Sequence, residues 1–489
     1  MQDYAPLLER AFDFIPQEDD YMVGEIEGEI PPFVKGDYYV NGPARFSRGG
    51  VRYRHWLDGD GMVCHLHFGS EGVRLVNRFV RTVKWEREEE AGKAIFRTFG
   101  TAFEGDQLNQ RGTGLESPAN VSVYEHGGTL LAFGEQGLPY RLQDDTLQTQ
   151  GLHTFGDRLS EVTPFAAHPK IDPGTGELFN FGVAFSALRP NLIVYRFDAQ
   201  GGLVMRKRHP LDAPCSLHDF GLSPNHTCFY ISPYVLDMQV LREGGSLIDS
   251  LSFEERESGR LIVAARESGG QRADLKMGPG YCLHVINTWE EDGLLHFDLV
   301  QLDEPAYPHY QEMPELFNEV GLGRPVRFTL DTHTWKLVEQ KQLNYELAPD
   351  FPAIDPRLTT RRYDDFWMLG ISAAGNSGRK FFDQLVRCRW SEPELEDLYQ
   401  APAKHYLGGE PIFIPDPESG NGVIICQIYD AQNRKASFAL FDPLKINQGP
   451  LARLHLRHPI PPLFHASWTP AQGQDYDPDY QPGDDWFKK

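Results

Sequence analysis

The sequence predicts one large all-β domain, and a β-propeller is the fold that best suits its length of 489 residues. Short apolar or alternating runs typical of strands recur along the chain, among them "NLIVYRF", "TCFYISPYV", "GRLIVAAR" and "GVIICQIYD". Turn clusters such as "DPGTGE" and "DPESGNG" separate these runs. The 47 Gly and 36 Pro are spread over the whole length, so no linker divides the chain. Internal repeats are not visible, and the residues alone therefore do not reveal the number of blades.

Helical patterns are sparse. "DYAPLLERAFDF" (residues 3–14) and "SEPELEDLYQ" (residues 391–400) predict helices. The segment Ser232–Ser258 has apolar residues at helical spacing, namely Val235, Met238 and Leu241. We expect this segment to pack on the core, with insertion into a lipid surface as the alternative. Residues from about 470 to 489 are polar, acidic and rich in Pro and Gly, which predicts a poorly ordered or surface-draped tail.

Composition and charge exclude several classes of protein. A formal charge of −23 leaves no basic patch for phosphate, so nucleic acid is not an expected partner, and strong attraction to anionic lipid is not expected either. No apolar run reaches the roughly 18–20 residues that span a bilayer. The first twenty residues lack the pattern of a secretory signal. Six scattered cysteines without a CxxC pair are typical of reduced thiols, so we expect a cytoplasmic protein.

Four of the 17 histidines lie in apolar or small-residue settings: His168 in "FAAHPKIDPGTGE", His218 in "PCSLHDFGLS", His284 in "YCLHVINTW" and His465 in "PPLFHASWTP". Strand alternation would place His284 on the same face as Cys282 and Ile286. A buried neutral imidazole must find partners for both ring nitrogens. A hydrogen-bonded core histidine satisfies this need, and so does a shared metal ion, because imidazole binds Fe, Zn, Cu and Ni. The residues alone leave both interpretations open.

Three carboxylates lie in settings similar to those of the histidines: Glu135 in "LLAFGEQGLPYRL", Asp350 in "LAPDFPAIDP" and Glu410 in "GGEPIFIPDP". Metal-bound imidazoles usually donate their second N–H to such a group. The motifs of other chemistries are missing, because the sequence has no GxGxxG after a strand, no GxxxxGK[ST] and no GxSxG. Carboxylates are numerous enough for a glycosidase pair, but the sequence indicates no particular pair.

At these residues the sequence resembles the carotenoid cleavage oxygenase family. Eight stretches follow the order of that family over nearly the whole chain: "IPPFVKGDYYVNGPARF", "HWLDGDGMVCHLHF", "ANVSVYEHGGTLLAFGEQGLPYRLQDDTLQTQG", "AHPKIDPGTGE", "LHDFGLS", "CLHVINTWEEDG", "GEPIFIPDP" and "LFHASW". The resemblance implies a seven-bladed β-propeller. It also implies a single domain over residues 1–489, with loop and helical insertions forming a cap over an iron site on the axis.

The resemblance further implies one Fe(II) per chain, with dioxygen as co-substrate. Its ligands would be His168, His218, His284 and His465. Three carboxylates would orient these imidazoles, namely Glu135, Asp350 and Glu410. Glu is usual at the middle one of these three positions in the family. The shorter Asp350 would therefore reach its imidazole by an adjustment of the backbone or through a water molecule.

The implied reaction is oxidative cleavage of one C=C bond of an apolar polyene into two carbonyl products. We therefore expect a dioxygenase that acts on a carotenoid or apocarotenoid. Weak peripheral contact with a membrane is expected around Tyr234–Leu251, where Asp237, Arg242 and Glu243 interrupt the apolar residues. The sequence leaves the cleaved bond and the oligomeric state open.

Two positions bear on the choice of substrate. Stilbene-cleaving relatives carry a Lys where this chain has Gly134, and that Lys helps to activate a phenol. Gly134 therefore counts against a stilbene or another phenylpropenoid, which is the alternative substrate class. Val121 falls where some relatives have a Thr beside the open iron position, and it would alter access there without a hydrogen bond. A propeller that only serves as a binding scaffold is the remaining, more distant alternative.

Overall fold

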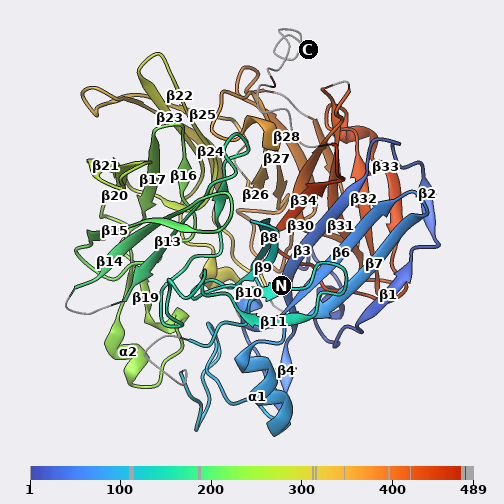
Figure 1. Cartoon of the computed structure of the whole chain (residues 1–489). Coiled ribbons are helices and arrows are strands. Elements are labelled where there is room, and N and C mark those ends of the chain that lie inside the picture. The colour runs from blue at the N-terminus through green and yellow to red at the C-terminus, as the bar shows by residue number, and fades with distance from the viewer. Residues whose placement is uncertain are drawn as a thin grey trace.

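The computed structural model describes residues 2–108, 115–185, 189–310, 313, 316–345, 347–394, 397–418, 420–474 and 480. Seven antiparallel sheets of four or five strands dominate it (Figure 1). The first strand of one sheet contacts that of the next, for example β22 with β26 and β26 with β30. These contacts arrange the sheets as blades around a central axis. The predicted all-β class and the seven-bladed propeller are confirmed.

Five blades contain four strands each, in chain order from the first strand outward, except that the two-stranded β18–β19 sheet is inserted in one of them. The bounds of these strands are β8 (Ser122–His126), β9 (Thr129–Phe133), β10 (Tyr140–Leu142), β11 (Thr149–Leu152); β12 (Lys170–Ile171), β13 (Leu178–Ala184), β14 (Asn191–Phe197), β15 (Leu203–Pro210); β16 (Gly221–Leu222), β17 (His226–Ile231), β20 (Gly259–Ala265), β21 (Gln271–Gly278); β22 (Tyr281–Glu291), β23 (Leu294–Leu302), β24 (Gly323–Asp331), β25 (Leu337–Gln342); and β26 (Asp350–Ala353), β27 (Asp365–Gly370), β28 (Gln384–Arg389), β29 (Asp397–Gln400).

The two remaining blades join the ends of the chain and close the ring. Their strands are β1 (Asp19–Met22), β7 (Gly72–Phe79), β6 (Asp60–Gly69), β3 (Gly36–Arg45), β34 (Ala466–Pro470); and β2 (Ile26–Gly28), β33 (Pro450–His455), β32 (Lys435–Phe441), β31 (Gly422–Asp430), β30 (His405–Pro415). Val40 of β3 lies opposite Ala466 of β34, and Ile26 of β2 lies opposite Leu454 of β33. Strands from both ends of the chain therefore complete blades that the rest of the chain begins, so the ring has no open seam.

The degree of burial explains why some strands can be recognised from the sequence and others cannot. Every residue of β31, the run "GVIICQIYD", is buried between neighbouring strands and blades. Outer strands alternate or are largely exposed, as in β25 with the sequence "LVEQKQ". Charged side chains on such an edge discourage pairing with another molecule.

Two helix predictions are wrong. Residues 397–400 form β29, which pairs with β28, and Leu398 and Tyr399 pack against the core. Within residues 3–14 only a short 3₁₀ turn forms, at Leu8–Ala11. In the first case, pairing with an existing sheet outweighs the local preference of the segment.

Helix α1 (Val83–Ala91) was not visible in the sequence because its buried residues are charged. The Thr82 side chain accepts a hydrogen bond from the Trp85 amide at its start, and Gly92, with φ of 63°, ends it. Lys84 and Glu88, one turn apart, point into the protein rather than into solvent. A search for apolar periodicity therefore misses this helix.

A buried network of charges fastens α1 to the propeller. The Lys84 ammonium lies 2.6 Å from Asp60 and 3.0 Å from Glu88, and all three side chains are at most 1% exposed. Arg48 adds a second cation, 2.7 Å from Asp60. Burial by itself would lower the pKa of Lys84, but Asp60, Tyr53 and Glu88 together raise it. Asp60 belongs to the "DGDGM" stretch, so this stretch anchors the helix.

Replacing Lys84 by Met is expected to lower the free energy of unfolding by about 3–5 kcal/mol, because Asp60 and Glu88 would keep their buried charges with one cation fewer. Denaturant titration measures this change. The exposed Lys435, at the start of β32, provides the control, since Lys435→Met is expected to change stability by less than about 0.5 kcal/mol. Equal effects of the two substitutions would contradict a stabilising role for the network.

The segment Ser232–Ser258 packs on the core, which was the first of the two expectations for it. It contains β18 (Tyr234–Leu236), α2 (Met238–Arg242), η3 (Ile248–Ser250) and β19 (Leu251–Phe253). Leu236, Met238 and Leu241 are buried and form one apolar cluster. Figure 1 shows α1 and α2 on the same side of the blades.

Three further predictions concern the cysteines, the membrane and the tail. All six cysteines are buried and none forms a disulfide. In the described part of the chain, no helix combines the length and hydropathy needed to traverse a bilayer. Most of the predicted tail, residues 475–479 and 481–489, lies outside the described residues.

Candidate metal centre

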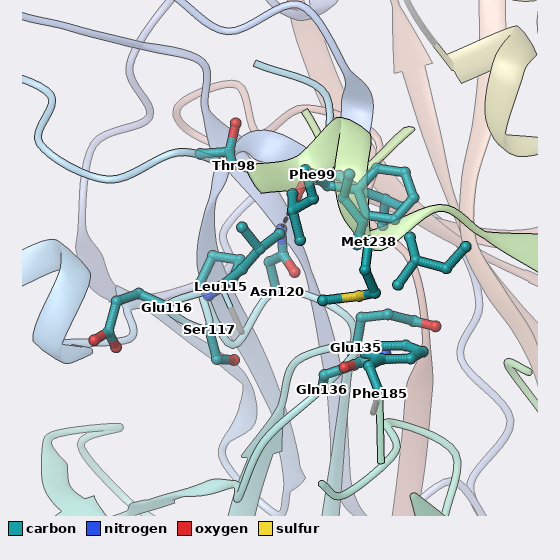
Figure 2. A pocket seen from close by; sticks show the side chains of 15 residues that line it. Thr98, Phe99, Leu115, Glu116, Ser117, Asn120, Glu135, Gln136, Phe185 and Met238 are labelled. Carbon is teal, nitrogen blue, oxygen red and sulfur yellow. Dashed lines mark hydrogen bonds between the residues drawn. The ribbon is translucent and has the colours of Figure 1, made fainter. Parts of the chain in front are cut away.

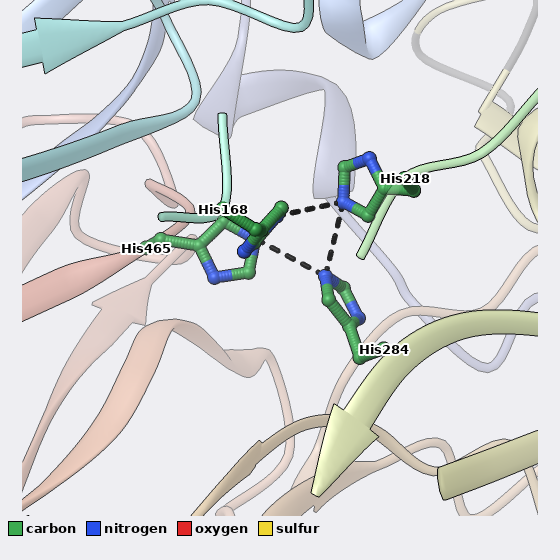
Figure 3. Close-up of side chains that lie close together, drawn as sticks. All are labelled: His168, His218, His284 and His465. Atoms are coloured by element: carbon green, nitrogen blue, oxygen red, sulfur yellow. Dashed lines mark hydrogen bonds between the residues drawn. The ribbon is translucent and has the colours of Figure 1, made fainter. Parts of the chain in front are cut away.

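The four predicted histidines converge at one buried point (Figure 3). The Nε2 atoms of His168 and His218 are 2.8 Å apart. His284 Nε2 is 3.2 Å from both His218 Nε2 and His465 Nε2. One nitrogen from each ring lies within 4.8 Å of those of the other three. None of the four residues is more than 6% exposed.

Four different blades supply these side chains. Each side chain lies at or near the strand of its blade that contacts the neighbouring blades around the axis. His168 precedes β12, His218 precedes β16 and His465 immediately precedes β34, whereas His284 lies within β22. Since these strands surround the axis, the four rings meet on it. This position explains how residues far apart in the sequence form one cluster.

The ladder between β22 and β23 is irregular at His284, between Cys282 and Val285, and again between Val285 and Asn287. The predicted strict alternation is therefore wrong at this point. Cys282 packs with Val285 in one apolar cluster, and Ile286 belongs to another. Such bulges redirect side chains, and here the irregularity surrounds the residue that turns toward the axis.

The geometry fits a metal ion. Metal–imidazole bonds of about 2.1 Å, the length found for zinc, would place neighbouring donors at right angles about 3.0 Å apart. Nδ1 of His218 and of His284 donates a hydrogen bond to a carboxylate, so Nε2 of each neutral ring carries a lone pair. Lone pairs that face each other in a buried space repel, and a cation between them removes that repulsion.

Each of the three predicted carboxylates contacts a different histidine of the cluster. His218 Nδ1 donates to Glu135 at 2.8 Å, and His284 Nδ1 donates to Asp350. His465 Nδ1 lies 3.3 Å from Glu410, the loosest of the three contacts.

Asp350 reaches His284 directly, so no water is needed for the contact. The backbone has an unusual conformation at this point. The next residue, Phe351, has φ of 52° and donates its amide to Asp350 Oδ1 at 2.9 Å. The ladder from β26 to β27 is also irregular between Asp350 and Ala353. The contact is thus made without a bridging water.

Burial favours neutral imidazoles, the form that binds metals, although Glu135 outweighs burial at His218 and raises the pKa of that ring. It lowers the pKa of His168 and of His465 well below the usual value, and the neighbouring imidazoles lower both further. Burial raises the pKa of Glu410 to about 7. For Asp350, burial acts in the raising direction, but His284 and the amide of Phe351 lower its pKa overall.

Two residues of this site were missed in the sequence. The hydroxyl of Tyr307, in η4 (Tyr307–Tyr310), lies 3.0 Å from His218 Nδ1 and 3.3 Å from Glu135 Oε1. His55 Nε2 donates to the Tyr307 carbonyl at 2.9 Å, while its Nδ1 accepts from the Leu57 amide at 3.0 Å. His55 therefore positions Tyr307. No local pattern around Tyr307 signals this role, whereas His55 lies directly before the quoted "WLDGDGM".

An apolar pocket ends at this site (Figure 2). Its apolar lining consists of Leu57, Phe99, Leu115, Pro118, Phe185, Leu236, Met238, Leu241 and Leu247. Glu135 belongs to the same lining, and it contacts His218. The pocket thus extends from the α2 segment to Glu135, the carboxylate behind His218.

Asp58 holds part of this wall in place. Its carboxylate accepts hydrogen bonds from the Gly100 amide at 2.7 Å and from the Thr101 hydroxyl at 2.6 Å. These contacts fix the loop that presents Phe99 to the pocket. The two aspartates of the "DGDGM" stretch therefore have separate tasks, since Asp60 anchors α1.

A second, more polar hollow reaches the site from another direction. His168, His284 and Glu410 contribute to its lining, together with Lys170 and Asp219. Lys170 and Asp219 form an ion pair at 2.8 Å. The four histidines therefore lie between an apolar and a polar space.

The two predicted positions for substrate and oxygen access also lie near the site. Val121 is buried, and its carbonyl accepts the amide of His465 at 3.1 Å. A Cβ atom placed on Gly134 would lie 2.1 Å from the Ser117 hydroxyl oxygen. Ser117 thus occupies the space that a side chain at position 134 would enter.

Comparison with known proteins agrees with this geometry. Residues 14–470 match the family model described as retinal pigment epithelial membrane protein. The chain is 31% identical to apocarotenoid-15,15'-oxygenase of Synechocystis sp., over 94% of this chain and 95% of that protein. It is 27% identical to lignostilbene-alpha,beta-dioxygenase isozyme III of Sphingomonas paucimobilis, over 93% and 95%.

A solved structure agrees as well. Cobalt-substituted Synechocystis apocarotenoid oxygenase matches with a TM-score of 0.87 and 28% identity, over 96% of this chain and all of that one. The propeller, the buried four-histidine cluster and these likenesses lead to one conclusion. The chain belongs to the retinal pigment epithelial membrane protein family, the carotenoid cleavage oxygenases, and is a non-haem iron dioxygenase of that family.

Proposed function

We propose that this protein cleaves one C=C bond of a carotenoid or apocarotenoid with dioxygen. Both oxygen atoms enter the products, so R–CH=CH–R' and O₂ give R–CHO and R'–CHO. The observation that carries the proposal is the apolar pocket that ends on Glu135, beside His218. A polyene has no polar groups along its length, and such a pocket favours it over polar substrates.

The proposed roles of the site residues follow from their contacts. The iron ligands are the four converging histidines, His168, His218, His284 and His465. The orienting groups are Glu135, Asp350 and Glu410, which hold three of the rings from the far side. When bound, iron(II) supplies the centre at which dioxygen is activated. Four neutral imidazoles add no negative charge to it and leave up to two coordination positions open.

The lining of the pocket argues against a phenolic substrate. Among the described residues that line it, there is no Lys, Arg, His or Tyr, and its ionisable side chains are the carboxylates of Glu116 and Glu135. Its Asn120 is already engaged, since its amide donates to the carbonyls of Leu57 and Gly59 at 2.8 Å each. Glu135 is engaged by His218 and Tyr307. Stilbene and phenylpropenoid cleavage therefore remains the second candidate.

A panel of substrates separates the two candidates. Aerobic incubation of the iron-loaded protein with an apocarotenal is expected to yield a shorter aldehyde, detected by chromatography. A hydroxylated stilbene such as resveratrol is expected to give at least about 100-fold lower kcat/KM, because no Lys lines the pocket to activate its phenol. Turnover of the stilbene with the apocarotenal untouched would replace the proposal by the second candidate.

The packing at Gly134 can be tested by substitution. Gly134→Ala is expected to lower the free energy of unfolding by about 1–3 kcal/mol and to reduce kcat/KM, because the new methyl group overlaps the Ser117 hydroxyl. Adding Ser117→Ala removes the overlap and is expected to restore most of both losses. Gly24→Ala is the matched control, since nothing lies within 4 Å of its Cβ. A Gly134→Ala variant as stable and active as the control would contradict this account of position 134.

Weak membrane contact is also part of the proposal. Around Tyr234–Leu251 the apolar side chains line the pocket, while Asp237, Arg242 and Glu243 face solvent. Since the exposed face is charged, we expect only a small fraction of the protein to float with phosphatidylcholine vesicles.

A further inference from the structure

A second cluster of side chains that could hold a metal ion lies on two paired strands of one blade, β3 and β6. Asp37 of β3 and His65 and His67 of β6 bring three ligand atoms within 4.8 Å of one another. Asp37 lies opposite His67, and Tyr39 lies opposite His65. Because alternate residues of a strand point to the same side, the three side chains share one face of the sheet.

The geometry of the cluster is compact. Asp37 Oδ1 is 2.7 Å from His65 Nε2 and also 2.7 Å from His67 Nδ1. The His65 ring is buried and stacks on Tyr39 with the centroids 4.4 Å apart, which holds its orientation. By contrast, the His67 side chain is 50% exposed and that of Asp37 is 26% exposed. The cluster therefore has one fixed ligand and two that solvent reaches.

The electrostatic surroundings favour a cation. Asp144, in the turn between β10 and β11 of the neighbouring blade, lies near enough for its charge to act on His65 and Asp37. Burial raises the pKa of Asp144, and repulsion from Asp145 and Asp37 adds to this rise. The nearest arginine along the sheet is Arg74, opposite His67 on β7. Its guanidinium is already paired with Asp20 through two contacts of 2.8 Å.

We propose that Asp37, His65 and His67 form a second metal site, distinct from the four histidines, which takes a divalent transition metal of the Zn²⁺ type. Two imidazoles and one carboxylate are a donor set that suits Zn²⁺, whereas Mg²⁺ and Ca²⁺ prefer oxygen ligands alone. Tetrahedral bonds of about 2.0–2.1 Å need donors about 3.3 Å apart, so the ligands must separate by roughly 0.6 Å. The two partly exposed side chains can make this movement.

Metal binding has a consequence for stability. Three protein ligands form the group, so water completes the coordination of the ion. Binding to the folded state alone stabilises it in proportion to the logarithm of the metal concentration. The ion therefore stabilises the pairing of β3 with β6, independently of the iron.

Calorimetric titration of the iron-loaded protein with Zn²⁺ tests the proposal. One equivalent is expected to bind in addition to the iron, and His67→Ala is expected to weaken this binding at least about 100-fold while leaving the iron content unchanged. The matched control is His333→Ala, an exposed histidine in the turn after β24. Zn²⁺ is expected to raise the melting temperature of the wild type and of this control, but not that of His67→Ala.

Two outcomes would contradict the proposal of a second metal site. One is the absence of saturable Zn²⁺ binding to the iron-loaded wild type at millimolar concentration. The other is binding of unchanged strength in His67→Ala, which would place the ion elsewhere. Neither readout depends on turnover, so the result stands apart from the test of the proposed substrate.

Discussion

His284→Ala is expected to lose most of the bound iron and to reduce kcat/KM by more than about 100-fold, beyond the loss caused by removing a group behind a ligand. The His284 ring is central to the cluster, since its Nε2 contacts that of His218 and that of His465, both at 3.2 Å. Without it, three imidazoles remain and Asp350 keeps a buried carboxylate with no partner ring. Metal analysis of the purified protein and turnover of an apocarotenal measure the two losses.

The control for this substitution is another buried histidine. His209 on β15 is 3% exposed and does not belong to the cluster. His209→Ala removes a similar volume but is expected to retain close to one iron per chain. Iron content unaffected by His284→Ala would refute the assignment of this ligand. A loss of iron in both variants, together with a lowered melting temperature, would show that it reflects unfolding rather than ligation.

Asp350→Asn is expected to weaken iron binding and to lower kcat/KM by about 10–100-fold. The substitution keeps an oxygen near His284 Nδ1 but removes the negative charge that makes this imidazole a stronger ligand. Glu410→Gln is expected to have an effect of less than about 10-fold, because Glu410 lies 3.3 Å from His465 in a looser contact. Retention of iron during dialysis against a graded chelator measures both.

A buried aspartate of the same blade serves as control for Asp350. Asp364 accepts the amide of Ser391 at 2.8 Å and is 6% exposed, but it does not contact the histidines. Asp364→Asn is expected to affect stability without changing the affinity for iron. If Asp350→Asn held iron as tightly as the wild type, the carboxylate would have no role in orienting His284.

Local sequence patterns predicted much of the fold and many of the residues of the site. Runs such as "GVIICQIYD" are continuous because both faces of the strand are buried, and this pattern predicts a strand without knowledge of its neighbours. The settings of His284 and Asp350 were also visible, since an ionisable residue within an apolar stretch is unusual. Resemblance to the family placed these residues in one site, a step that spacing alone did not support.

Other elements could not be predicted because their partners are distant in the chain. Leu398 and Tyr399 look helical by local pattern, but an available edge of β28 makes them a strand. Helix α1 could not be predicted from apolar periodicity, because its inward-facing residue is a lysine. Lys84 can be buried only because the fold places carboxylates, Asp60 among them, beside it. Tyr307 joins the site only through the position of η4, which its neighbours in sequence do not reveal.

The sequence by itself determined the β class, the inventory of histidines and carboxylates, and the membership of the family. The tertiary structure decided the geometry: the direct contact of Asp350 with His284, the filling of position 134 by Ser117, and the meeting of Asp37 with His65 and His67. The physical reason is that residue types and periodicities are local properties of the chain. Contacts depend on strand register, on bulges and on how the blades close, and a shift of one residue in register turns every side chain of a strand to the other face.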